Sequence, residues 1–93
     1  MAAPIPPVLV TVSDPGAAAT LIELLGEDYG GVLAPGEGGS AMVVVRPIDE
    51  QRRSVVLYRV IQASRSVVDR HPEATLYLLT EDGSRWRLPP PTL

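Results

Sequence analysis

Residues 49–70, DEQRRSVVLYRVIQASRSVVDR, decide the fold, because this stretch can be interpreted in two ways. A recurring spacing of three and four residues places one set of side chains on one face of a helix: Leu57, Val60, Ile61, Ser64, Val67 and Val68. The shorter run SVVLYRVI (54–61) has the composition of a strand instead, and it could pair back on AMVVVR (41–46). We favour the helix, since Arg59 fits its polar face and Pro72 follows where a helix should end. The strand remains the alternative.

The segment near the N-terminus changes in the middle from a strand-like to a helix-like composition. VLVTV (8–12) is rich in β-branched residues and predicts a strand. The following run has an apolar helical stripe, formed by Ala18, Leu21, Ile22 and Leu25. Between the two, Asp14 can cap the first N–H groups of the helix, and Pro15 is favoured at the first helical position. A strand followed by a well-capped helix is therefore expected.

Two more strands are expected in the middle of the chain. GGVLAP (30–35) is a short candidate bounded by glycines, and GEGG (36–39) predicts a turn. AMVVVR (41–46) lacks polar alternation, which predicts a strand that is buried on both faces.

The last strands form a predicted hairpin in TLYLLTEDGSRWRL (75–88). Asp82-Gly83 is a typical two-residue loop, because both central positions of a type I′ turn need positive φ. This loop implies a register with Leu79 opposite Trp86 and Tyr77 opposite Leu88, while Leu76, Leu78, Arg85 and Arg87 share the other face. We expect the two aromatic side chains, Tyr77 and Trp86, to pack in the core.

Together the segments give the order β-α-β-β-α-β with an added C-terminal hairpin strand. This is the order of an α+β, ferredoxin-like sandwich with its helices on one face of an antiparallel sheet. The domain should span 8–88, between an extended Pro-rich arm (1–7) and a Pro-rich tail (89–93). Its other sheet face would be open, and we predict that Leu76, Leu78, Arg85 and Arg87 form an interface there.

The amino-acid composition argues against several classes of function. The 93 residues carry a net charge of −3, which argues against a general attraction to nucleic acid or anionic membranes. Seven acidic residues and one arginine lie in 1–50, whereas seven arginines and four acidic residues lie in 51–93. Cysteine is absent, which excludes disulfides, thiolate nucleophiles and cysteine-based zinc sites. The start lacks a basic signal-peptide region and no apolar run could span a bilayer, so we expect a cytoplasmic protein. The arginine-only basic residues, with many Ala, Val, Gly and Pro, indicate a GC-rich bacterial source.

The stretch VTVSDPGAAATLIELLGEDYGG (10–31) resembles the opening of an ACT domain: strand, Asp-Pro-Gly loop, helix and glycine-terminated turn. The resemblance implies pairing between subunits and binding of an amino acid at the loop after the first strand. It would place Asp14, Pro15 and Gly16 beside that effector, and Tyr29 and Gly30 near a partner subunit. The long second helix and the additional hairpin strand depart from the family's pattern.

Catalytic and metal-binding constellations are missing from the sequence. His71 is the only histidine, and a polar helix exit explains it more simply than general-base chemistry. We therefore expect a non-enzymatic association module without a cofactor, which pairs with a second copy or with a partner protein. The alternative is an ACT-like domain that binds an amino acid or another small carboxylate. A third candidate is a dimeric α+β barrel enzyme that uses Tyr58, His71 or Arg46.

Overall fold

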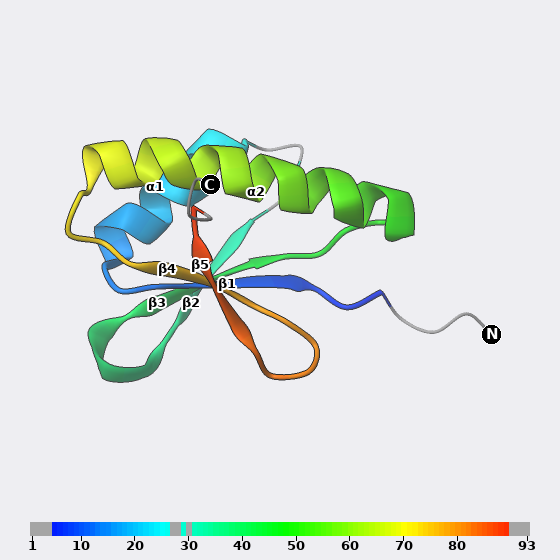
Figure 1. Ribbon diagram of the computed structural model, residues 1–93, viewed down its shortest axis with the longest axis horizontal. Coiled ribbons are helices and arrows are strands. Elements are labelled where there is room, and N and C mark those ends of the chain that lie inside the picture. Colours follow the sequence, from blue (N-terminus) through cyan, green and yellow to red (C-terminus); the bar gives the residue numbers. More distant parts are fainter. Residues whose placement is uncertain (1–4, 27–28, 30, 90–93) are drawn as a thin grey trace.

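The computed structural model describes residues 5–26, 29 and 31–89. It is an α+β domain in which two helices cover one face of a five-stranded antiparallel sheet (Figure 1). The elements are β1 (Val8–Val12), α1 (Pro15–Leu25), β2 (Val32–Pro35), the 3₁₀ turn η2 (Glu37–Gly39), β3 (Ala41–Val45), α2 (Glu50–Arg70), β4 (Leu76–Leu79) and β5 (Arg85–Leu88). The strands lie in the order β2-β3-β1-β4-β5. Gly30, residues 1–4 of the predicted arm and 90–93 of the predicted tail lie outside the described residues.

The helical interpretation of 49–70 is confirmed, and the strand alternative is wrong. Asp49 caps α2 by accepting a hydrogen bond from the backbone N of Arg52 at 2.7 Å, and the helix ends just before His71 and Pro72. The buried stripe of the helix runs through Val56, Val60, Ala63, Ser64 and Val67. Within it, the Ser64 hydroxyl donates to the carbonyl oxygen of Ile61 at 2.6 Å, so its burial leaves no polar group unpaired. None of the described helices is long and apolar enough to cross a membrane.

The start of α1 also follows the prediction. Asp14 is the N-cap and Pro15 the first helical residue, where its missing N–H costs nothing. Gly26 ends the helix with φ +83°, a conformation that favours glycine. The buried residues Ala17, Ala18, Leu21 and Leu25 face the sheet and hold α1 on it. Both helices lie on the same side of the sheet.

Strand β3 differs from its prediction. Only alternate residues of β1 and β3 are buried, namely Val8, Val10, Val12, Ala41, Val43 and Val45. The intervening Met42 and Val44 lie on the opposite face and stay partly exposed, so burial of β3 on both faces is wrong. The reason is that both helices cover the same side of the sheet, which leaves the other side without a second layer.

The hairpin is one residue longer at its loop than predicted. The backbone N of Thr80 donates to Ser84 O at 2.9 Å, and that of Gly83 donates to Thr80 O at 3.1 Å. Gly83 has φ +87°, so the loop is a three-residue turn closed by a glycine bulge. The observed pairs are Leu76 with Leu88, Tyr77 with Arg87, Leu78 with Trp86, and Leu79 with Arg85. The predicted register is therefore wrong by one residue.

This shift changes which side chains face the helices. Leu76 is fully buried, and Leu78 packs against the core from the same side. Both were expected on the open face, so that placement is wrong, whereas Arg85 and Arg87 do lie there. Trp86 is 64% exposed at the sheet edge, and Tyr77 lies on the sheet face away from the helices, so the expected place of both aromatic side chains in the core is wrong. A one-residue slip exchanges the two faces of a strand, because side chains alternate along it.

Candidate functional site

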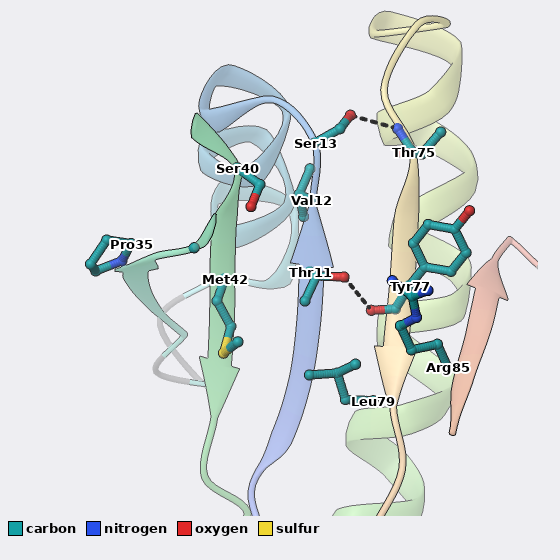
Figure 2. A pocket seen from close by; sticks show the side chains of 11 residues that line it. Thr11, Val12, Ser13, Pro35, Ser40, Met42, Thr75, Tyr77, Leu79 and Arg85 are labelled. Atoms are coloured by element: carbon teal, nitrogen blue, oxygen red, sulfur yellow. Dashed lines mark hydrogen bonds between the residues drawn. The ribbon is translucent and has the colours of Figure 1, made fainter. Parts of the chain in front are cut away.

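The sheet face away from α1 and α2, here called the open face, becomes more polar along its strands. Cross-strand register places Val32, Val44, Leu9 and Leu79 side by side in an apolar row that ends at Arg85. The next row is mixed and consists of Ala34, Met42, Thr11, Tyr77 and Arg87. Beyond it lie three hydroxyl side chains, Ser40, Ser13 and Thr75 (Figure 2). One end of the face is therefore apolar and the other carries hydroxyls.

Met42, Thr11 and Tyr77 of the mixed row and the three hydroxyl residues line an open hollow of about 770 Å³, together with Leu79 and Arg85. Its edge at the end of β1 is held by two hydrogen bonds, from Ser13 N to Thr75 O at 3.0 Å and from Thr75 N to the Ser13 hydroxyl at 2.9 Å. The Thr11 hydroxyl donates to Tyr77 O at 3.5 Å, which is a weak bond (Figure 2). The hollow thus has a firm backbone frame and hydroxyls within it.

Arg85 reaches over β4 from the edge strand. Its guanidinium carbon lies 5.3 Å from the centre of the Tyr77 ring, a cation–π contact that orients the charged group (Figure 2). Arg85 is the only charged residue among the described residues that line the hollow. Neither ion pair of the described residues, Arg53 with Glu81 or His71 with Asp14, involves it. The hollow therefore presents a positive charge at its rim.

The Asp-Pro-Gly loop lies at the same end of the sheet but has its own polar contacts. The Asp14 carboxylate accepts from Gly16 N at 3.4 Å and from Ala17 N at 3.3 Å, so the cap occupies the donors that an anion would need. The loop residues Asp14, Pro15 and Gly16 are exposed, and Tyr29 is partly exposed beyond the end of α1. The observed contacts of this loop are those of a helix cap.

His71 links the two helices through this loop. Its Nδ1 lies 3.7 Å from the Asp14 carboxylate, and its Nε2 lies 3.0 Å from the Thr20 hydroxyl. This Thr–His–Asp series resembles the arrangement of a hydrolase. In a hydrolase the acid is hydrogen-bonded to the histidine, whereas here 3.7 Å separates His71 Nδ1 from the Asp14 carboxylate, which is beyond hydrogen-bond distance. The Thr20 hydroxyl also donates to Gly16 O at 3.1 Å, so these contacts connect the end of α2 to the first turns of α1.

The residues considered for an enzyme do not converge. Arg46 follows β3 near the start of α2, and His71 follows the end of that helix. A 21-residue helix is about 31 Å long, so these two residues lie far apart. Tyr58 is 62% exposed on α2 and accepts a hydrogen bond from Gln62 at 3.0 Å. Among the described residues no three histidine or acidic side chains are grouped so that they could hold a metal ion.

Sequence reasoning identified Arg85 and Arg87 on the open face but did not single out Leu9, Val44, Leu79 and Val32, which form its apolar row. Alternation within the first and third strands could have found the first two of these residues, since one face of each strand had to meet the helices. Leu79 required the hairpin register.

Comparisons with protein-family models, with curated proteins and with solved structures find no match to this chain.

Proposed function

We propose that this protein is a small non-enzymatic association module that forms a homodimer through the open face. The proposal rests on the apolar row of Val32, Val44, Leu9 and Leu79, whose residues come from four neighbouring strands. No element in the described part of the chain covers this row. Apolar side chains gathered on an uncovered sheet face are typical of an association surface, because packing a second layer removes them from water.

A second copy fits the charges of this face. Arg85 and Arg87 lie on β5 at one edge, whereas β2 at the other edge consists of uncharged residues. A two-fold axis parallel to the strands would stack β5 of each copy over β2 of the other. The arginines of the two copies then lie at opposite edges, which avoids facing like charges. The symmetric dimer is therefore electrostatically permitted without a separate acidic partner.

The size of the face sets the expected strength. Five strands spaced about 4.8 Å apart, each about five residues long, cover roughly 24 Å by 17 Å, or about 400 Å² in plan. A standard interface buries about 800 Å² per partner. Protruding side chains add to this area, but the face by itself still makes an interface at the small end of the size range of stable interfaces. We therefore expect a dimer whose population depends on concentration.

Sedimentation equilibrium of the 9.9 kDa chain, with two matched variants, tests the proposal. Val32 and Leu33 are neighbours on edge strand β2 and are 62% and 47% exposed, but they point to opposite faces. Val32→Arg should give a monomer at concentrations where wild type and Leu33→Arg are dimeric, with the folded state of each checked by circular dichroism. A wild type that stays monomeric up to millimolar concentration, or Leu33→Arg alone dissociating, would refute the interface.

The second candidate is a regulatory domain of the ACT kind, built on a ferredoxin-like sandwich to which β5 is added. The β-α-β-β-α-β order and the Asp14-Pro15-Gly16 loop at the start of α1 support it. The hollow beside the end of β1 supplies a place for an effector near this loop. A thermal-shift screen with the twenty amino acids tests it, and no response to any of them would exclude amino-acid regulation.

A further inference from the structure

We propose that the hollow on the open face binds a small monocarboxylate with an apolar body. Its volume of about 770 Å³ lies within the range of small-molecule pockets, roughly 300–1,000 Å³. The hollow combines an apolar floor with a few polar groups, which is the usual composition of such sites. Met42 and Leu79 provide the floor, while Arg85 and Ser13 lie at its polar borders (Figure 2).

The charge at the rim selects an anion. The guanidinium carbon of Arg85 lies over the Tyr77 ring, 5.3 Å from its centre, and neither ion pair of the described residues occupies its N–H groups. A carboxylate can accept two parallel hydrogen bonds from a guanidinium group. Among the side chains that the structure describes around the hollow, none is acidic. A single arginine suits one carboxylate better than a phosphate dianion, which needs more donors.

The hydroxyls offer a second contact. The Ser13 Oγ accepts a hydrogen bond from Thr75 N at 2.9 Å, so its own hydrogen remains available to donate. Thr11 donates only at 3.5 Å to Tyr77 O, and its hydroxyl can turn toward a ligand at little cost. Met42 and Leu79 would contact the apolar body of the ligand, so a hydrophilic anion would gain less from the site.

Pairing of two copies would enclose this site. A second copy on the open face would exclude water from the hollow and strengthen the contact between Arg85 and the carboxylate. The ligand should then favour the dimer, by the reciprocity of coupled binding. This coupling rests on the proposed function, whereas the binding site itself does not.

Titration of ¹⁵N-labelled protein with sodium benzoate, followed by NMR, tests the site. We expect shifts of the backbone amides of Thr11, Ser13, Tyr77 and Arg85. Arg85→Gln should weaken benzoate binding about tenfold or more, since a charge-assisted hydrogen bond is lost. Arg87→Gln is the matched control, because Arg87 lies on the same strand and face but does not line the hollow. Benzamide, the uncharged analogue of benzoate, should bind about tenfold more weakly than benzoate to the wild type.

The results separate the two proposals. The site is refuted if benzoate leaves these amides unchanged, if Arg85→Gln binds it as wild type does, or if benzamide binds equally well. Val32→Arg lies outside the hollow and tests the coupling: it should still bind benzoate, but more weakly than the dimeric wild type. Benzoate binding by a wild type that is monomeric throughout would support the site and overturn the dimer.

Discussion

Replacing Asp14 with alanine should destabilise the fold at the junction between β1 and α1. The Asp14 carboxylate accepts from the backbone N of Gly16 at 3.4 Å and of Ala17 at 3.3 Å. It also lies 3.7 Å from Nδ1 of His71. Asp14→Ala removes all three contacts and leaves two helical N–H groups to water.

The expected loss of stability is dominated by the cap. Loss of an aspartate N-cap costs about 1 kcal/mol, within a range of about 0.5–2 kcal/mol. The contact with His71 adds little, because the side chains of His71 and Asp14 are 31% and 53% exposed and solvent screens such pairs to about 0–1 kcal/mol. We therefore expect about 1 kcal/mol, which corresponds to a fall in Tm of roughly 4–8 °C for a domain of this size.

Urea unfolding at pH 7 measures this loss, with Asp14→Asn as the control. Asparagine caps a helix as well as aspartate does but carries no charge, so it should stay within about 0.5 kcal/mol of wild type. All proteins are compared at one low concentration, since association would add to the measured stability. If Asp14→Asn is as unstable as Asp14→Ala, the charge and not the cap stabilises the junction, and the reasoning is wrong.

Two further predictions concern the hairpin. Leu76→Ala should lower the free energy of unfolding by about 2–5 kcal/mol because Leu76 is fully buried. Leu79→Ala on the open face should lower it by less than about 1 kcal/mol in the monomer. Chemical unfolding of both variants checks the observed register, and equal losses of stability would contradict it. The hydrogen bond from the Thr80 hydroxyl, with a smaller effect of the bond from Ser84 N, lowers the pKa of Asp82 from its ordinary 3.8. The charged Asp82 carboxylate therefore stabilises the loop above pH 3.8, and this contribution disappears as the pH falls through the lowered pKa. A pH titration of Asp82 followed by NMR tests this, and a midpoint above 3.8 would contradict it.

Both helices could be predicted because the signals that define them are local. Asp14 and Pro15 begin α1, Asp49 begins α2, and Pro72 follows its end. Each of these residues acts within a few positions of itself, through capping or through a missing N–H. The apolar spacing in each helix then selects the face that meets the sheet. A single sequence contains all of this information.

The register of β4 and β5 could not be predicted in the same way. The letters EDGS fit a two-residue turn at Asp82-Gly83 and also a three-residue loop with a bulge at Gly83, since both need a glycine with positive φ. Which of the two loops forms depends on contacts between residues that are distant in sequence. In the observed register Leu76 and Leu88 are paired and both are buried on the side of the sheet that the helices cover.

The three-residue loop between β4 and β5 also creates the candidate site. With a two-residue loop, Arg85 would share a face with Leu76 and Leu78, and the Tyr77 ring would lie on the opposite side of the sheet. The observed three-residue loop moves Arg85 to the face of Tyr77, where its guanidinium carbon lies 5.3 Å from the centre of the Tyr77 ring beside the hollow. This contact is therefore a consequence of core packing at Leu76 and Leu88 on the far side of the same strands. A substitution that shifts this hairpin register should remove the positive charge from the hollow while the hydroxyls of Ser13 and Thr75 stay in place.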